Sequence, residues 1–315
     1  MNILVTGGSG FLGHNLILQL CRAGHNVTCL DRFEANFLRE NNVRFIAGDM
    51  SEKNLVNQSL DGIDAVIHMA CTILPQMSNV DPYFDLVTNV GSTIQLLDAC
   101  VQHKVGKMIF LSSGGTVYGK LQEIPVKETA STNPTCSYGI TKLTIEKYLR
   151  LYHQLHGLRT HAIRLANPYG RFQRVKSVQG VIPVFCYNAL TDQEIQIWGD
   201  GTVQRDFIYI DDAVGAIMKL LDYNGDDLPE MNVGSGRAFS LNELLDGIRT
   251  ILGKEIKVKY MPKRDFDVPV SLLDISRAEK YLNWKPQYSL MEGLEKTIIW
   301  IKENELNTYP FQGNR

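Results

Sequence analysis

Short apolar runs alternate with helix-like patterns along the first half of the chain. Runs of strand type cover six segments: residues 2–6, 26–30, 43–46, 63–68, 106–111 and 158–163. Apolar residues recur with helical spacing in four segments between them: residues 11–23, 52–59, 82–103 and 137–156. Strands that alternate with helices in this way predict an α/β fold with a doubly wound parallel sheet. Ligands of such a sheet bind beyond the carboxyl ends of its strands, so residues at those ends are the candidates for chemistry.

The alternation changes near residue 167. Beyond it the pattern predicts further elements near residues 180–190, 194–198, 240–252 and 290–304. We therefore expect a Rossmann-type domain over residues 1–166, with a return segment near residues 203–233, and a smaller α+β substrate-binding domain over residues 167–315.

Composition narrows the class of protein but names no function. The chain has 315 residues, 44% of them hydrophobic and 21% charged, which is ordinary for a globular protein with a sizeable core. Its formal net charge of −2 gives no electrostatic basis for binding nucleic acid or an anionic membrane. No apolar run approaches the ~20 residues of a membrane span, and the chain starts with a strand rather than a signal peptide. The six cysteines show no Cys-x-x-Cys spacing, so we expect reduced thiols, no metal site and a cytoplasmic protein.

A glycine-rich turn follows the first predicted strand. Gly7, Gly10 and Gly13 have the spacing that allows a tight turn, the close approach of a pyrophosphate and the packing of a helix on a strand. The helix that starts at Phe11 would offer free N–H groups and the positive end of its dipole to phosphates. Asp31 ends the second strand, near the distance at which a carboxylate accepts hydrogen bonds from an adenosine ribose. An ordinary glycine turn is the alternative, but this context favours a dinucleotide site.

Other polar or small residues follow the next strands. Asp49 either accepts from an adenine amino group or is an exposed loop carboxylate. His68 is more typical of a packed core histidine than of a catalyst, and the small Ala70 leaves room for a cofactor to pass. Asn89 lies off the apolar stripe of helix 82–103, so it either reaches the site or faces solvent.

The strongest candidate for chemistry is the pair Tyr138 and Lys142, one helical turn apart. A phenol is a poor base near neutral pH, because its unperturbed pKa is about 10. Lowering that pKa by ~3 units takes roughly 4 kcal/mol, which the Lys142 ammonium and a bound nicotinamidium could share. The phenolate could then take a proton from a sugar hydroxyl while a hydride leaves its carbon. The spacing alone also fits two surface residues, but the dinucleotide loop and the serine-rich strand end at 112–113 favour catalysis.

With these motifs the chain resembles the extended short-chain dehydrogenase/reductases of the NAD-dependent epimerase/dehydratase family, and most closely their UDP-glucose 4-epimerase-like members. The resemblance covers nearly the whole chain. Besides the glycine loop, it rests on Asp31, Asp49, His68-Met69-Ala70, Asn89-Val90-Gly91, Ser112-Ser113, Tyr138-x-x-x-Lys142 and Arg164-x-x-Asn167-x-Tyr169-Gly170. It implies tightly bound NAD, with NADP less favoured, and a nucleoside-diphosphate sugar as substrate. It also implies a homodimer that pairs helices 82–103 and 137–156.

The resemblance assigns roles residue by residue. The residues implied to bind the cofactor are Gly7, Gly10, Phe11, Leu12, Gly13, Asp31, Arg32, Asp49, Met50, Ala70, Asn89, Ser112, Tyr138 and Lys142. Tyr138 and Lys142 are also implied to be catalytic, together with a hydroxyl. In 4-epimerases a Ser or Thr stands at the position of Gly114, so here Ser113, Thr116 or a water supplies that hydroxyl. Asp31 favours NAD over NADP, whereas Arg32 stacks on the adenine, softens that selection or is a solvated charge.

The substrate contacts are implied in the second half of the chain. Asn167, Arg205 and Arg264 are implied to hold the diphosphate, a role suited to bidentate guanidinium groups. Asp267 is implied to bind the nucleotide ribose. Ser271 stands where family 4-epimerases gate the space around the sugar's 2-substituent. Its small side chain predicts a pocket that takes N-acetylhexosamines as well as hexoses.

The leading hypothesis is a nucleotide-sugar 4-epimerase in which Tyr138 takes the O4 proton and NAD takes the C4 hydride. A 4-ketosugar reductase that uses the same site once, with exchangeable NAD(P)H, is the alternative that Gly114 and Arg32 keep open. Related dehydratases and decarboxylases carry a carboxylate in the segment that matches residues 114–116, where this chain has none. The intact Tyr138 and Lys142 disfavour a non-enzymatic nucleotide sensor.

Overall fold

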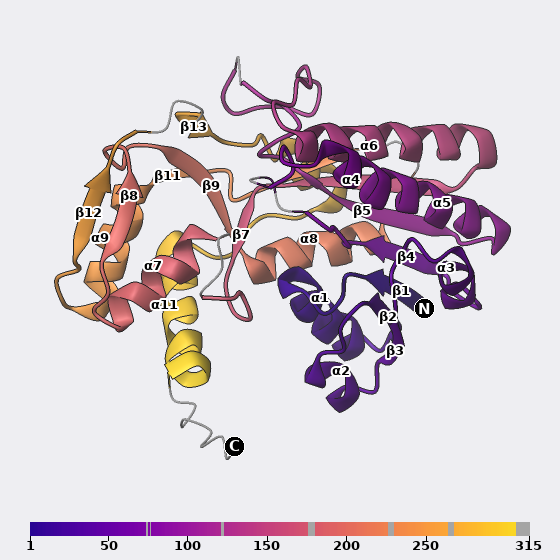
Figure 1. Ribbon diagram of the computed structural model, residues 1–315, viewed down its shortest axis with the longest axis horizontal. Coiled ribbons are helices and arrows are strands. Elements are labelled where there is room, and N and C mark those ends of the chain that lie inside the picture. The colour runs from indigo at the N-terminus through magenta and orange to yellow at the C-terminus, as the bar shows by residue number, and fades with distance from the viewer. Residues whose placement is uncertain are drawn as a thin grey trace.

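Seven parallel strands form the central sheet in the described part of the chain. The structure is a computed structural model that describes residues 1–73, 75, 77–120, 123–175, 180–225, 230–263 and 268–306. The strands are β1 (Asn2–Thr6), β2 (Asn26–Asp31), β3 (Arg44–Ala47), β4 (Ala65–His68), β5 (Lys107–Ser113), β6 (Arg159–Leu165) and β10 (Glu230–Val233). They pair in the order β10-β6-β5-β4-β1-β2-β3, each parallel to its neighbours. The predicted doubly wound parallel sheet is confirmed (Figure 1).

Helices cover both faces of this sheet (Figure 1). One face carries α1 (Phe11–Arg22), α2 (Asn36–Glu40) and α8 (Ile210–Asp222), and the other carries α3 (Lys53–Ser59), α5 (Ser92–Gln102) and α6 (Ser137–His156). Side chains alternate along β1, so Ile3 and Val5 pack on the α1 side and Leu4 packs on the α5 side. Each of these three is fully buried, which stabilises the fold by about 1.5–3 kcal/mol per side chain. Burial on both faces is why these strands read as unbroken apolar runs.

A smaller α+β lobe follows the sixth strand. Its strands β7 (Asn167–Tyr169), β9 (Gln204–Tyr209), β11 (Ala238–Ser240) and β13 (Val270–Ser271) form one sheet, and β8 (Ile195–Trp198) pairs with β12 (Val258–Met261). The helices packed there are α7 (Val181–Leu190), α9 (Leu241–Leu252) and α11 (Leu290–Ile301), while α10 (Ser276–Leu282) contacts β10. Between them the chain returns to the central sheet through α8 and β10, which pairs with β6. The division into two domains at residue 167 stays a prediction.

The helix predicted over residues 82–103 is interrupted. It consists of α4 (Pro82–Asp85), a π-helical stretch η1 (Leu86–Gly91) and α5. A second π-helical stretch, η2 (Lys302–Leu306), follows α11. Apolar periodicity did not reveal either one, because a π turn shifts the stripe only locally. Such turns are rare and occur often at functional sites. Within the described ranges, none of the helices combines the length and apolar character needed to cross a membrane.

Candidate active site

The glycine loop closes tightly around the carboxyl end of β1. Gly7 has a φ of 72°, and a Cβ there would lie 2.7 Å from the Ala70 nitrogen. A Cβ on Gly13 would lie 2.5 Å from the Gly8 backbone. A Cβ on Gly10, by contrast, would have only the Gly7 carbonyl oxygen nearby, at 3.4 Å, so a ligand can approach its backbone closely. The loop therefore fits a dinucleotide pyrophosphate at the N-terminus of α1.

Two backbone N–H groups orient Asp31. Its carboxylate accepts from Ser9 N at 3.0 Å and from Arg32 N at 2.7 Å. A carboxylate has about four acceptor positions, so capacity remains for the two hydroxyls of a ribose. The Arg32 side chain is exposed at the rim, and Asp49 and Met50 are half-buried after the neighbouring strand β3. This edge of the sheet therefore fits the adenosine half of a dinucleotide.

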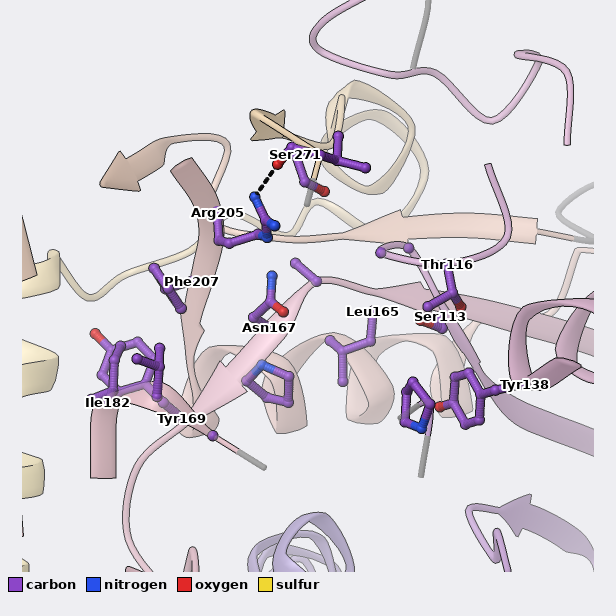
Figure 2. Close-up of a pocket in the computed structure, with 18 of the residues that line it drawn as sticks. Ser113, Thr116, Tyr138, Leu165, Asn167, Tyr169, Ile182, Arg205, Phe207 and Ser271 are labelled. Atoms are coloured by element: carbon purple, nitrogen blue, oxygen red, sulfur yellow. Dashed lines mark hydrogen bonds between the residues drawn. The ribbon is translucent and has the colours of Figure 1, made fainter. Parts of the chain in front are cut away.

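A cavity of about 740 Å³ lies between the central sheet and the smaller lobe. The predicted site residues that line it are Phe11, Leu12, Ser112, Ser113, Thr116, Tyr138, Lys142, Asn167, Arg205 and Ser271. Figure 2 shows Tyr138 with Ser113 and Thr116 in one part of the cavity, and Asn167, Arg205 and Ser271 in the part built by the smaller lobe. The structure thus brings the predicted chemical and substrate-holding residues to one space.

Tyr138 and Lys142 share a face of α6, as predicted, but Lys142 alone does not lower the pKa of the phenol. Burial raises that pKa, and the charges that Cys71, Cys136 and Asp85 carry when ionised raise it further. The Lys142 ammonium donates to the Leu111 carbonyl at 2.8 Å and lies 5.5 Å from the centroid of the Tyr138 ring. Burial also lowers the pKa of Lys142. Further positive charge, of the kind that an oxidised nicotinamide ring carries, is therefore needed to favour the phenolate.

Leu273 fills the space in front of Gly114. A Cβ on Gly114 would lie 2.5 Å from Leu273 Cδ1 and 3.1 Å from the Arg164 carbonyl oxygen. Leu273 is 1% exposed and packs against Val117, so it has little room to move. The chain therefore cannot carry a hydroxyl at this position without a rearrangement.

Of the two alternative hydroxyls, Thr116 has the more informative environment. Its Oγ1 is buried and forms no hydrogen bond within the described residues. A buried hydroxyl without a partner is rare, and Thr116 is one of the residues that line the cavity. Ser113 also lines the cavity and is half-buried.

The Ser112 hydroxyl is hydrogen-bonded within the protein rather than directed at the cavity. Its Oγ donates to the carboxylate of Glu146 on α6. Glu146 also accepts two hydrogen bonds from Arg164, at 3.1 and 2.7 Å, and all three side chains are buried. The Ser112 hydroxyl therefore has no proton left to donate to a cofactor.

The described residues that were predicted to contact the substrate lie on β7, β9 and β13. Asn167 donates from Nδ2 to the Asp206 carbonyl at 2.9 Å and lines the cavity. Arg205 donates to the carbonyl oxygens of Gln204 and Val268 at 2.8 and 2.6 Å. Ser271 on β13 is the backbone pairing partner of Arg205 on the neighbouring strand β9. The predicted Arg264 and Asp267 lie outside the described residues.

Several residues that line the cavity were not predicted from the sequence. Gln173 is one, and its Oε1 is buried without a hydrogen-bond partner in the described part of the chain. Gln196 and Trp198 on β8 are two more. They stand in segments without a recognisable motif, so only the fold reveals them.

Two predicted residues have mainly structural contacts. His68 is buried, with ring nitrogens 2.7 Å from Thr6 Oγ1 and 2.9 Å from Thr93 Oγ1. Burial and the nearby Lys142 lower its pKa to about 3, so it is neutral near physiological pH, which agrees with a packed core histidine. Asn89 is buried and donates to Asp85 at 2.9 Å rather than facing solvent. No group of His, Cys, Asp or Glu suited to a metal ion occurs among the described residues.

The fold and the site define a class of Rossmann-type enzymes that act with a bound dinucleotide. The chain matches the NAD dependent epimerase/dehydratase family over residues 3–234. A putative UDP-glucose 4-epimerase of Methanocaldococcus jannaschii is 34% identical over 307 residues, covering 96% of this chain and 99% of that protein. A dTDP-4-dehydro-6-deoxyglucose reductase of Escherichia coli is 33% identical over 311 residues, covering 95% of this chain and 97% of that protein.

A solved structure shows the same architecture. The UDP-glucose 4-epimerase of Thermotoga maritima, determined with UDP-glucose, superposes with a TM-score of 0.91 at 33% identity and covers 97% of this chain and 100% of its own. The chain therefore belongs to the NAD-dependent epimerase/dehydratase family, as its motifs indicated.

Proposed function

We propose that the protein is an NAD-dependent nucleotide-sugar 4-epimerase, acting on UDP-glucose and UDP-galactose or on the corresponding N-acetylhexosamines. The observation that carries the proposal is that one cavity holds the Tyr138–Lys142 pair together with Arg205 and Asn167. A proton-transfer pair and a diphosphate anchor in the same space suit a sugar that is tethered by its nucleotide. The similarity to a UDP-glucose 4-epimerase supports the same reaction.

The proposed chemistry divides between the cofactor and the chain. When bound, NAD would serve as the acceptor of the hydride from C4 of the sugar and as the donor that returns it. Tyr138 removes the O4 proton as the 4-keto sugar forms and gives a proton back when the hydride returns. Lys142 contributes positive charge next to the phenol. Thr116 or Ser113 donates a hydrogen bond to the reacting oxygen in place of the hydroxyl that Gly114 lacks.

The proposed anchoring leaves the sugar free to turn. Arg205, with Arg264 and Asn167, holds the diphosphate, and Asp267 holds the nucleotide ribose. Because these contacts all lie on the nucleotide side, the 4-keto sugar can present its other face before the hydride returns. Ser271 is small, so the pocket has room for an N-acetyl group. Turnover of UDP-glucose with none of UDP-N-acetylglucosamine would contradict the assignment to Ser271.

NAD is proposed over NADP because of Asp31. Its carboxylate would pair with the ribose hydroxyls and repel a 2′-phosphate. Arg32 is the residue that could weaken this selection, since it follows Asp31 directly and its side chain is exposed. Affinities for the two cofactors, measured on wild type and Arg32→Ala, test the assignment.

A 4-ketosugar nucleotide reductase is the second candidate, and the similarity to a dTDP-4-dehydro-6-deoxyglucose reductase favours it specifically. Both reactions use the same Tyr138 and the same hydride position. They differ in whether the cofactor is consumed, so a stoichiometric need for NADPH separates them.

A proton NMR time course tests the proposal. Purified protein, without added cofactor, is mixed separately with UDP-glucose and UDP-N-acetylglucosamine. We expect the C4 epimer of at least one sugar to appear and reach equilibrium, and Tyr138→Phe to abolish this while retaining the cofactor. No change in either sugar, with or without added NAD⁺, contradicts the epimerase. Oxidation of NADPH with a 4-keto sugar would then support the reductase.

A homodimer is also proposed, with a second copy of the chain covering the outer face of α4 and α6. That face exposes large apolar side chains, including Tyr83 at 76% and Leu155 at 65%, together with Ile140 and Leu151. The α4–η1 segment packs against α6, so these side chains lie on neighbouring elements. Light scattering at micromolar concentration should give twice the chain mass. A monomer mass would contradict the dimer, and Leu155→Glu should shift the mass toward the monomer.

A further inference from the structure

Asp85, the last residue of α4, is a carboxylate with no exposed surface. Its Oδ1 accepts from Asn89 Nδ2 at 2.9 Å, and its Oδ2 accepts from Ser137 Oγ at 2.7 Å and from Thr141 Oγ1 at 3.1 Å. Among the described residues, no Lys or Arg forms an ion pair with it. A buried carboxylate is costly unless it is well bonded, so its place calls for an explanation.

The two hydroxyls that bind Asp85 come directly before the two residues of the chemical pair. Ser137 precedes Tyr138, and Thr141 precedes Lys142. The two hydroxyl residues are therefore one turn of α6 apart, and so are the two residues of the chemical pair. A carboxylate that binds both Ser137 and Thr141 fixes the rotation of this helical turn about its axis. The same rotation decides where Tyr138 and Lys142 point.

The residues just before α4 also bind the backbone at the start of α6. The helix's own N-cap residue, Cys136, makes no side-chain capping bond. Instead Ser78 Oγ accepts from Tyr138 N at 3.0 Å, and Asn79 Oδ1 accepts from Ser137 N at 2.8 Å. Residues 78–85 therefore replace the local cap, and the position of the Tyr138 backbone depends on them.

The π-helical stretch connects this anchor to the loop after β4. Asn89 binds Asp85 through Nδ2, and its Oδ1 accepts from Thr72 N at 3.1 Å. Cys71 and Ile73, on either side of Thr72, line the cavity. Asp85 is thus the centre of a bonded set that joins the cavity wall to the helix that carries Tyr138.

Asp85 is also one of the acidic groups that act on the Lys142 ammonium. The titratable groups that act on Tyr138 and Lys142 are Cys71, His68, Cys136, Asp85 and Glu146. Glu146 is already neutralised by its bidentate pair with Arg164. His68 is neutral near physiological pH. Burial lowers the pKa of Lys142, whereas Cys71 and Asp85 raise it when they are ionised. Of the carboxylates that act on Lys142, Asp85 is the one that no Arg or Lys pairs with in the described part of the chain.

We propose that Asp85 is a positioning residue, which fixes the first turn of α6 through Ser137 and Thr141 and whose charge balances Lys142 beside Tyr138. The inference rests on the proposed role of Tyr138 in the epimerase reaction. Removing the charge of Asp85 removes a neighbour that favours protonation of both Tyr138 and Lys142. Both groups should then titrate at lower pH.

Asp85→Asn tests the proposal, because an amide can keep much of the hydrogen bonding but carries no charge. Tyrosine labelled with ¹³C at Cζ is followed by NMR with NAD⁺ bound, and Tyr138→Phe assigns the resonance. We expect the Tyr138 titration to move to lower pH by about one unit. The turnover number should fall at least about tenfold, since small misplacements of a reacting group are expensive, while KM stays within about twofold.

Asp98→Asn is the matched control. Asp98 also accepts a hydrogen bond from α6, donated by the Tyr152 hydroxyl. It lies on α5, which packs against α6, but it contacts the end of α6 that is far from Tyr138. This control should leave the Tyr138 titration and turnover as in wild type. Coincidence of the Asp85→Asn titration and turnover number with those of wild type overturns the proposal, even if the melting temperature falls.

A second variant covers failure of Asp85→Asn to fold. The double variant Ser137→Ala, Thr141→Val keeps the carboxylate but removes its grip on α6. It should lower the turnover number several-fold at unchanged KM, and wild-type turnover would overturn the positioning role. If wild type turns over neither sugar nucleotide, the proposed function fails, whereas the NMR titration with NAD⁺ bound still decides the role of Asp85.

Discussion

Replacing Gly114 by serine should destabilise the protein, although this change restores the residue type found in related 4-epimerases. The new Cβ would lie 2.5 Å from Leu273 Cδ1, far inside ordinary contact distance. Leu273 is buried against Val117, and the Arg164 carbonyl at 3.1 Å closes the other side. Overpacking of this kind costs about 1–3 kcal/mol of unfolding free energy.

A double-mutant cycle with Leu273→Ala gives the magnitude. Leu273→Ala alone should cost about 2–5 kcal/mol, because it opens a cavity in a packed core. In the double variant the serine occupies part of that cavity and the overlap disappears. The double variant should therefore be less destabilised than the sum of the single changes, with a coupling of about 1–3 kcal/mol.

Urea unfolding of wild type, both single variants and the double variant measures this coupling. Gly115→Ser is the matched control, because a Cβ on Gly115 has no neighbour within 4 Å. It should change the unfolding free energy by less than about 1 kcal/mol. A coupling between Gly114 and Leu273 within about 0.5 kcal/mol of zero would refute the assignment of Leu273 to this space.

Three further predictions concern the cavity and its support. Thr116→Val should lower turnover more than Ser113→Ala, because only the Thr116 hydroxyl is buried without a partner; equal or reversed losses in steady-state kinetics would contradict this. Gln173→Leu should raise KM for the sugar nucleotide with little change in stability, and an unchanged KM would remove Gln173 from the substrate contacts. Burial raises the pKa of Asp206 to about 6 from an ordinary 3.8, so its contribution to stability is present below about pH 4 and is lost as pH rises to about 6. Urea unfolding should show that loss, up to about 3 kcal/mol, in wild type and not in Asp206→Asn; parallel pH profiles of the two would contradict it.

The sheet could be predicted because each of its strands is buried on both faces. Ile3, Leu4 and Val5 all need apolar side chains, so β1 reads as an unbroken run, and the helices between strands read with a different period. The glycine loop and the Tyr138–Lys142 pair were visible for a related reason. Each is a short motif in which neighbours along the chain do the chemistry together.

What the sequence could not reveal depends on contacts between distant segments. Gly114 is explained by Leu273, and the start of α6 by Ser78 and Asp85, yet no local pattern links these positions. The balance of charge at Tyr138 depends on such contacts too. Burial raises the pKa of the Tyr138 phenol, which the spacing of Tyr138 and Lys142 cannot show. The expected lowering of that pKa by Lys142 and a bound nicotinamidium together stays a prediction.

The most direct test of the central claim follows the hydrogen at C4 of the sugar. UDP-glucose that carries deuterium at C4 is incubated with the purified protein, and the product is analysed by NMR and mass spectrometry. If the hydride leaves and returns within one site while Tyr138 moves the O4 proton, the galactose epimer forms with its deuterium retained. A C4 epimer that carries hydrogen from solvent, or formation of product only when NADPH is consumed, would contradict an epimerase that works through a transient 4-keto sugar.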